Sequence, residues 1–123
     1  MFTEIEFWPP PVEGWEVVEG RDYQTCDVTE SLRKYYGSGL VRAFYLRLPP
    51  GGKLHRHTDA GDVITHHVVL TTNPKAVNWW VSEGKELSQH LGPGFYLADR
   101  TLEHWAVNDG TTARTHLLLE FRK

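Results

Sequence analysis

Two histidines and one aspartate carry the strongest chemical signal in this sequence. His57 and Asp59 lie two residues apart, and His104 follows much later in the chain. Residues two apart on a strand point to the same side, so His57 and Asp59 can enter a barrel together, and His55 can join them. One carboxylate and two imidazoles form a facial triad that binds iron(II) and leaves other positions open. These residues predict a divalent metal site, with iron(II) as the expected metal.

Arg114 offers a second kind of chemistry, the recognition of an anion. It opens the predicted last strand, ten residues after His104 and just beyond the turn at residues 108–110. Because Asn-Asp-Gly is typical of a tight hairpin, we expect His104 and Arg114 on neighbouring antiparallel strands. An arginine near the metal can hold a carboxylate through two parallel hydrogen bonds. The metal would then bind the other end of the same molecule.

The chain after Gly39 is predicted to consist of short strands. Runs rich in apolar and aromatic residues alternate with Pro, Gly and Asn turns, a pattern typical of a β-sandwich or β-barrel. The expected strands cover residues 40–48, 53–57, 66–72, 76–81, 95–98, 105–108 and 114–121. This pattern predicts a mostly β fold.

Residues 1–39 are predicted to form an N-terminal arm with an edge strand at 15–18 and one short helix. Asp27 or Thr29 can cap the start of this helix, and Gly37 is expected near its end. Three aromatic residues of the arm are expected to pack on the outside of the domain: Phe7, Trp8 and Trp15.

Composition narrows the class of protein. The 123 residues include 40 % hydrophobic and 24 % charged residues, which fits one globular domain spanning 1–123. The formal net charge is −3 without a basic cluster, which argues against duplex nucleic acid as a partner. Cys26 is the single cysteine, and no apolar run approaches the roughly 20 residues of a membrane span. With no basic, signal-like start visible, we predict a cytoplasmic protein outside the membrane.

Several motifs, taken in order, resemble the aspartyl/asparaginyl β-hydroxylase family. They are Pro49-Pro50-Gly51-Gly52, His57-Thr58-Asp59, His67-Val68-Val69-Leu70, Glu83-Gly84-Lys85, Leu102-Glu103-His104 and Arg114. The resemblance covers about residues 40–122. It implies a double-stranded β-helix, a jelly-roll or cupin-like barrel, at 40–123. It also implies an oxygenase that uses iron(II) and 2-oxoglutarate to hydroxylate an Asp/Asn-type, amino-acid-like or other small substrate.

The resemblance assigns roles to individual residues. It implies that His57 and His104 bind iron, with Asp59 completing the triad common in the wider oxygenase superfamily. It implies that Arg114 holds the distal carboxylate of 2-oxoglutarate and that His67 lies beside the proximal carboxylate. The family often carries an arginine on the strand before His67, where this chain has Thr-His.

Two other readings stay open at this point. His55, His57 and His104, followed by Asn108, also resemble the two short motifs of metal cupins. In that case His55 replaces Asp59 as a ligand, and the protein is an isomerase, dioxygenase or lyase that needs no 2-oxoglutarate. A non-catalytic binding barrel is the third interpretation. The expected partner is a small molecule or short peptide, and a predicted edge strand leaves a homodimer open.

The remaining pocket candidates follow from strand parity and polarity. His66 and His67 point to opposite sides of a strand, so only one can face the interior. His116 shares the parity of Arg114 and is expected to face inward with it. Further candidate pocket residues are His55, Asn78, Trp80 and Tyr45.

Overall fold

The structure, a computed structural model, describes residues 15–17, 22–59, 62–98 and 101–123. Within these ranges the elements are β1 (Glu16–Val17), β2 (Gln24–Asp27), α1 (Thr29–Tyr36), a 3-10 helix η1 (Gly37–Gly39), β3 (Leu40–Leu48), β4 (Lys53–His57), β5 (Val63–Thr71), β6 (Ala76–Ser82), β7 (Lys85–Gln89), β8 (Gly94–Ala98), β9 (His104–Asn108) and β10 (Arg114–Arg122). Phe7 and Trp8, expected on the outside of the domain, lie outside the described residues.

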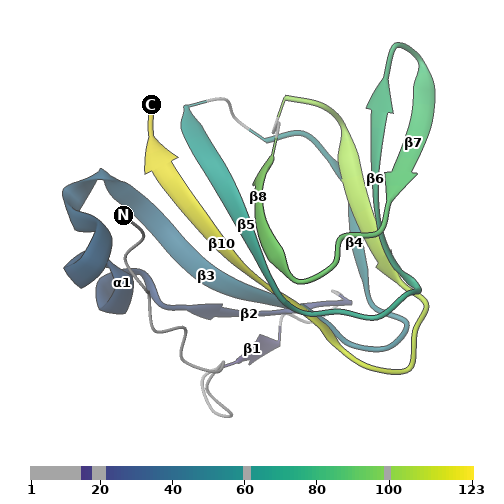
Figure 1. Ribbon diagram of the computed structural model, residues 1–123, viewed down its shortest axis with the longest axis horizontal. Helices are drawn as coiled ribbons and strands as arrows, with labels where there is room; N and C mark the ends of the chain where they lie inside the picture. The colour runs from purple at the N-terminus through teal and green to yellow at the C-terminus, as the bar shows by residue number, and fades with distance from the viewer. Residues whose placement is uncertain (1–14, 18–21, 60–61, 99–100) are drawn as a thin grey trace.

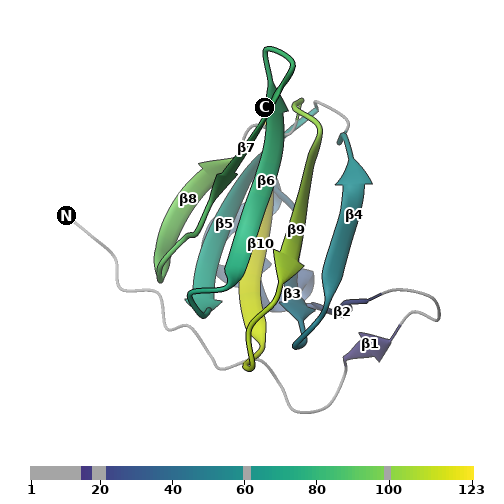
Figure 2. The same cartoon turned by 90° about the vertical axis from the view of Figure 1, so that its right-hand side faces the viewer.

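The strands form two antiparallel sheets that face each other (Figures 1 and 2). The large sheet has the order β1-β2-β3-β10-β5-β8, and the small sheet has the order β4-β9-β6-β7. β1 is the predicted edge strand and pairs with β2 alone. The expected mostly β fold, a cupin-like jelly roll with one short N-terminal helix, is confirmed.

The hydrophobic core lies on the outer face of the large sheet, and residues of α1 pack against it. Figure 1 shows α1 beside β3. Ala43 and Tyr45 of β3 pack there beside Leu117 and Leu119 of β10, all nearly inaccessible to solvent. The N-cap residue of α1 is Val28, without a side-chain cap, so the predicted cap by Asp27 or Thr29 is wrong. The Thr29 N–H does donate to Oδ1 of Asp27 at 2.8 Å, and the helix ends before Gly37, as predicted. Because the outer face is filled by this core, the inner face is left for the residues of the site.

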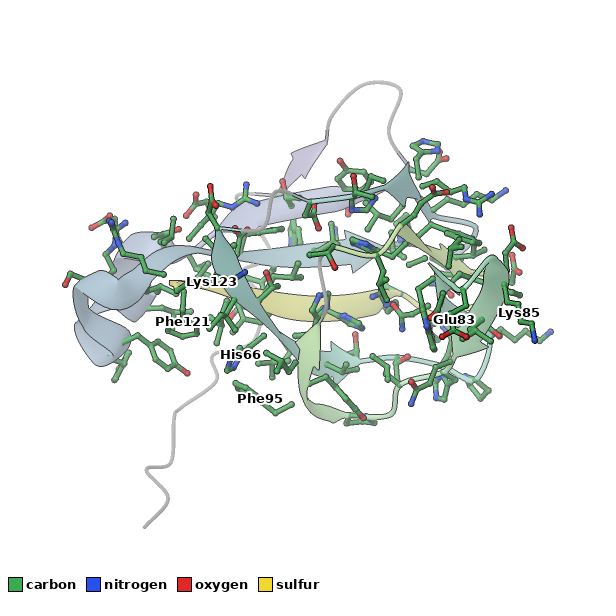
Figure 3. The ribbon with its side chains drawn as sticks, turned by 90° about the horizontal axis from the view of Figure 1, so that it is seen from above. His66, Glu83, Lys85, Phe95, Phe121 and Lys123 are labelled. Carbon is green, nitrogen blue, oxygen red and sulfur yellow. The ribbon has the colours of Figure 1, made fainter. Side chains whose placement is uncertain are left out.

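His66 confirms the alternation of β5. Its ring lies on the outer face of the large sheet, 5.2 Å from the ring of Phe95 and 5.3 Å from that of Phe121 (Figure 3). His67, its neighbour in the chain, therefore points inward, and it lines the cavity described below. Only one of the two histidines faces the interior, as predicted.

The connection between β9 and β10 differs from the prediction. The two strands were expected to form a hairpin, but β9 pairs with β4 and β6 whereas β10 pairs with β3 and β5 in the other sheet. Asn108, fully buried, directs this crossover because its Nδ2 donates to the carbonyls of Leu48 and Thr112. Its Oδ1 accepts the Gly110 N–H. The side chain thus links the crossover loop to β3 instead of letting a hairpin close.

Two further strands were missing from the prediction. β2 is short, and β7 is polar, with all five of its residues exposed. β7 is paired because Glu83 and Gly84, with φ of 52° and 75°, form a two-residue turn of the kind that closes a hairpin with β6. The turn was expected at this place, but the strand after it carries no apolar alternation that would predict it.

Candidate metal and anion site

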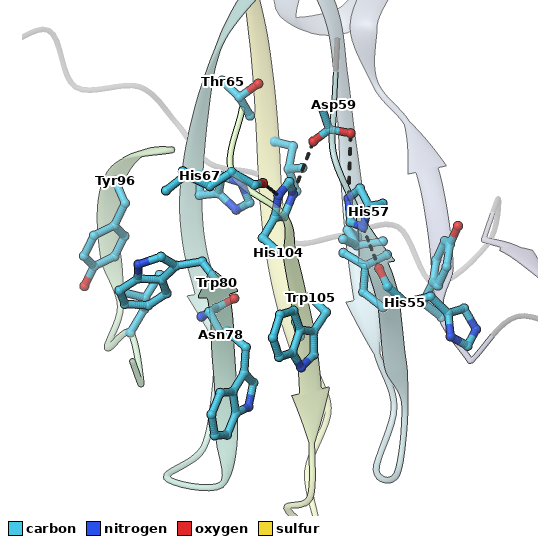
Figure 4. Close-up of a pocket in the computed structure, with 18 of the residues that line it drawn as sticks. His55, His57, Asp59, Thr65, His67, Asn78, Trp80, Tyr96, His104 and Trp105 are labelled. Carbon is cyan, nitrogen blue, oxygen red and sulfur yellow. Dashed lines mark hydrogen bonds and ion pairs between the residues drawn. The ribbon is translucent and has the colours of Figure 1, made fainter. Parts of the chain in front are cut away.

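A cavity of about 970 Å³ lies between the inner faces of the two sheets. Its mouth and walls are formed by strands of both sheets, so residues far apart in the sequence meet there (Figure 4). The predicted site residues that line it are His55, His57, Asp59, His67, Asn78, Trp80, His104 and Arg114.

A β-bulge in β4 decides which histidine faces His104. Between the pairs Leu54–Ala106 and His57–His104, β4 has two residues where β9 has one. The extra residue shifts the alternation, so Leu54 and His57 both point inward although they are three apart. His55 does not share the face of His57, contrary to the expectation from simple strand parity. Its side chain is exposed at the rim of the cavity and points away from the cluster (Figure 4).

His57, Asp59 and His104 converge at one end of the cavity (Figure 4). The Nε2 atom of His57 lies 3.7 Å from Oδ1 of Asp59, and Nε2 of His104 lies 3.2 Å from Oδ2. One donor atom from each residue can be chosen so that all three lie within 4.8 Å of one another. All three side chains are partly buried. Among the described residues, this is the one group of three or more His, Cys, Asp or Glu side chains with such spacing.

The backbone fixes the tautomer of both histidines. Nδ1 of His57 lies 2.6 Å from the carbonyl oxygen of His55, and Nδ1 of His104 lies 2.7 Å from that of Leu102. A carbonyl oxygen only accepts, so each Nδ1 carries a proton and each ring turns Nε2 toward Asp59. Two imidazole nitrogens and a carboxylate thus face one another. This donor set fits a divalent metal held by Nε2 atoms.

Arg114 forms the second half of the site and is 2 % exposed. Its Nε donates to Nε2 of His116 at 2.9 Å, and its Nη2 donates to Oδ1 of Asn78 at 3.0 Å. Neither partner is an acid, and Nη1 has no hydrogen-bond partner among the described residues. Burial lowers the pKa of Arg114 to about 10. A buried guanidinium with an open donor is a binding site for an anion.

His116 faces inward as predicted and is 1 % exposed. Burial, and then the charges of Arg114 and His67, lower the pKa of His116 well below its ordinary value. Its Nδ1 lies 3.2 Å from Nδ1 of His67. The ring is therefore neutral, and it links Arg114 to the wall of the cavity at His67.

The structure places one candidate elsewhere. Tyr45, expected to line the pocket, lies on the outer face of the large sheet in the core beneath α1. Its chain neighbours Phe44 and Leu46 line the cavity instead. All three residues are apolar or aromatic, so polarity alone could not show which parity of β3 faces inward. Asn78 and Trp80 do line the cavity, from the facing strand β6.

Thr65 is a cavity residue that the sequence did not single out. It is 3 % exposed, and its Oγ1 has no hydrogen-bond partner among the described residues. Its place two residues before His67 on one strand puts both side chains on the inner face. Its spacing from His67 could have predicted that Thr65 faces the cavity, but this spacing does not indicate any functional role for the hydroxyl.

Solved structures share this fold at low sequence identity. A predicted oxalate decarboxylase from Thermotoga maritima has a TM-score of 0.58 and 15 % identity, over 82 % of this chain and 81 % of that one. A Cupin 2 conserved barrel domain protein from Salinispora arenicola has a TM-score of 0.61 and 11 % identity, over 97 % and 90 %. A recombinant oxalate oxidase in complex with glycolate has a TM-score of 0.63 and 14 % identity. The match covers 84 % of this chain but only 52 % of that oxidase, so this chain spans about half its length. These similarities establish a cupin barrel.

The sequence itself is matched by one family description. No curated protein matches this chain. No helix within the described residues is both long and apolar enough to cross a membrane. The description "Aspartyl/Asparaginyl beta-hydroxylase" matches residues 19–123, which include every residue of the metal and anion site. The chain therefore belongs to the aspartyl/asparaginyl β-hydroxylase family.

Proposed function

We propose that this chain is an iron(II)- and 2-oxoglutarate-dependent oxygenase that hydroxylates an amino-acid-like or other small substrate. The observation that carries the proposal is Arg114, a buried guanidinium that has no acidic hydrogen-bond partner among the described residues and lines the same cavity as the group His57, Asp59 and His104. A metal site alone fits many cupins. A metal site that shares its cavity with a buried guanidinium fits a ligand that has a chelating end and a distal carboxylate.

The surroundings of Arg114 support an anionic ligand. Burial lowers the pKa of Arg114 to about 10, so the charged guanidinium is disfavoured unless a negative charge lies beside it. Its partners, His116 and Asn78, are neutral acceptors that orient the guanidinium without cancelling its charge. A carboxylate on the open Nη1 would supply that negative charge.

The register of the strands bears on the distance between the two half-sites. Asn78, which binds Arg114, pairs with Ala106, whereas Trp80 pairs with His104. The two levels are two residues apart along β6, about 7 Å at the rise of a β-strand. A five-carbon oxo diacid is of that order of length. This spacing supports one ligand that reaches from the metal group to Arg114.

The residues have separate tasks in this proposal. His57, Asp59 and His104 would hold iron(II) on one face and leave the other side open toward the cavity. Arg114 would bind the distal carboxylate of 2-oxoglutarate, and His67 lies on the wall beside the remaining carboxylate. When bound, iron(II) and 2-oxoglutarate would supply the oxidative chemistry: one oxygen atom of O₂ would enter a substrate C–H bond and the other would enter the succinate formed, with CO₂, from the oxo acid. Arg114 is 2 % exposed, so the distal carboxylate would lie where bulk water is largely excluded.

The test separates the metal from the anion site. Anaerobic titration of wild-type protein with iron(II) and 2-oxoglutarate should give the weak visible absorption of a metal chelate, and air should then convert 2-oxoglutarate to succinate. Arg114→Met should keep metal binding but weaken 2-oxoglutarate binding by at least about 30-fold, since a carboxylate would lose its buried partner. The same variant should bind 2-oxopentanoate, which lacks the distal carboxylate, as the wild type does.

Two outcomes would overturn the proposal in different directions. Metal binding without any effect of 2-oxoglutarate would favour a metal cupin that uses no cosubstrate. No metal binding, with unchanged thermal stability of wild type and His57→Ala on adding metal, would favour a non-catalytic barrel.

A further inference from the structure

The Arg114 guanidinium is oriented by a chain of buried side chains that the proposed function does not use. Nε of Arg114 donates to Nε2 of His116 at 2.9 Å, and Nδ1 of His116 lies 3.2 Å from Nδ1 of His67. The rings of the two histidines meet edge to face, with 5.5 Å between their centroids. All three side chains come from adjacent strands of the large sheet, β10 and β5. His116 stands between the anion site and the cavity wall.

Counting donors and acceptors shows what a neutral His116 offers to Arg114. A neutral imidazole accepts at one nitrogen and donates at the other. Both ring nitrogens face Arg114, because Nε lies 2.9 Å from Nε2 of His116 and Nη2 lies 2.9 Å from Nδ1. Either neutral tautomer therefore gives Arg114 one acceptor, whereas a doubly protonated ring would give it none. Nη2 of Arg114 also donates to Oδ1 of Asn78.

We propose that His116 is a positioning residue: as a neutral ring that accepts a hydrogen bond from Arg114, it aims the open Nη1 of Arg114 at the distal carboxylate of the oxo acid and links that guanidinium to His67. This inference rests on the proposed function of Arg114. The reason for a histidine at this place is charge. An acidic partner would orient Arg114 equally well but would neutralise it, and an apolar residue would leave a long side chain without orientation. A neutral acceptor does both tasks, because it fixes Nε and preserves the positive charge for the ligand.

The decisive measurement compares two ligands that differ only at the distal end. With Mn²⁺ present as a redox-stable metal, the Kd values of 2-oxoglutarate and 2-oxopentanoate are measured for wild type, His116→Leu and His116→Gln. We expect His116→Leu to weaken 2-oxoglutarate by roughly 10- to 100-fold, the effect of losing a hydrogen bond to a charged group. Binding of 2-oxopentanoate should stay within about twofold of wild type. His116→Gln, which retains an acceptor, should recover most of the affinity for 2-oxoglutarate.

A purely structural role for His116 predicts a different pattern. A general disturbance of the cavity would weaken both acids together, and an unimportant residue would weaken neither; each result overturns the inference. With iron and O₂, succinate formation should show a raised KM for 2-oxoglutarate with an unchanged kcat, whereas a collapse of kcat at saturation would argue against positioning. Arg114→Met separates the two proposals. If Arg114→Met binds 2-oxoglutarate as tightly as the wild type, the proposed function fails. If Arg114→Met binds it weakly but the His116 variants bind it as tightly as the wild type, only this inference fails.

A measurement on the wild-type protein does not depend on whether any variant folds. The ¹⁵N chemical shifts of the imidazole distinguish the two neutral tautomers and the cation. We expect His116 at pH 7 to carry one proton only. Protonation on both nitrogens would remove the acceptor that Arg114 requires and would overturn the inference. His116→Phe, which retains a ring but no acceptor, repeats the ligand comparison if the leucine variant does not fold.

Discussion

The bulge in β4 makes a sharp prediction about which histidine binds metal. In a regular strand His55 and His57 would share a face, and a ligand set of His55, His57 and His104 would be possible. The register shift turns His57 toward His104 and leaves His55 exposed at the rim. We expect His57→Ala, and equally Asp59→Ala, to abolish metal binding, and His55→Ala to leave it intact. His55 is the matched control, since it is the same residue type on the same strand.

The expected size of the effect follows from linkage. A metal present at 100 times its Kd stabilises the folded state by about 2.7 kcal/mol. Unfolding entropy is about 2.1 cal/mol/K per residue, so the 123 residues of this chain give about 0.26 kcal/mol/K. The ratio predicts that saturating Mn²⁺ raises Tm by about 10 °C in wild type and in His55→Ala. A variant that has lost one of three ligands should show almost no shift.

Thermal unfolding with and without Mn²⁺, after chelator treatment, measures this directly. Isothermal titration supplies the Kd independently, so that a change in fold stability is not mistaken for a change in affinity. If His55→Ala abolishes the Tm shift while Asp59→Ala retains it, the bulge argument is refuted and the cupin ligand set is correct.

Three further predictions concern stability. Thr65→Val removes a buried hydroxyl without a described partner and should stabilise the protein by about 1 kcal/mol in urea unfolding. Thr29→Val removes a hydroxyl that is hydrogen-bonded to the backbone of Ala43 at 3.0 and 3.2 Å, and it should destabilise the protein by about 1–3 kcal/mol. Changes of the same sign in both variants would contradict the reasoning. The pKa of His116 is depressed in the folded state, so below about pH 6.5 the unfolded chain binds a proton that the folded chain does not bind. The free energy of unfolding should therefore fall from pH 7 to pH 5, by up to about 1.4 kcal/mol per pH unit more steeply in wild type than in His116→Phe. Equal slopes would exclude this linkage. Gly110→Ala should cost roughly 1–3 kcal/mol, because the new Cβ would collide with the side-chain amide of Asn73. A wild-type Tm for this variant would show that the crossover loop adjusts without cost.

Local signals in the sequence predicted most of the strands. The run at 40–48 ends at Pro49 and Gly51, and β3 and β4 have the predicted bounds because proline and glycine end strands wherever the chain goes next. The Glu83-Gly84 turn was visible for the same reason. Turns of this kind depend on the dihedral angles of a few residues, so the sequence predicts them whatever the tertiary structure around them.

Features that depend on distant partners were not predictable from these signals. The bulge in β4 exists only relative to β9, and the exchange of sheets between β9 and β10 depends on Asn108 reaching the carbonyl of Leu48, 60 residues earlier. Tyr45 was misplaced because both faces of β3 are covered, which removes the polar alternation that would show the inner face. The residues of the candidate site were found through their order and types, but their geometry required the register.

The hydrogen bonds that hold both half-sites lead to a last prediction, about ligand length. Arg114 is held from two sides by His116 and Asn78. The rings of His57 and His104 are held by the carbonyls of His55 on β4 and of Leu102 just before β9. With both half-sites held in this way, at levels about 7 Å apart along β6, one ligand chain length should fit best. One methylene more or less costs about 1–3 kcal/mol in such a site, so 2-oxoglutarate should bind roughly 10- to 200-fold more tightly than oxaloacetate or 2-oxoadipate. Competition titrations with Mn²⁺ measure these ratios. Equal affinities would mean that the Arg114 side chain moves to meet ligands of different length, and Arg114→Lys should then bind 2-oxoglutarate nearly as well as the wild type. A steep dependence on ligand length that disappears in Arg114→Met would instead locate the distal carboxylate at this guanidinium.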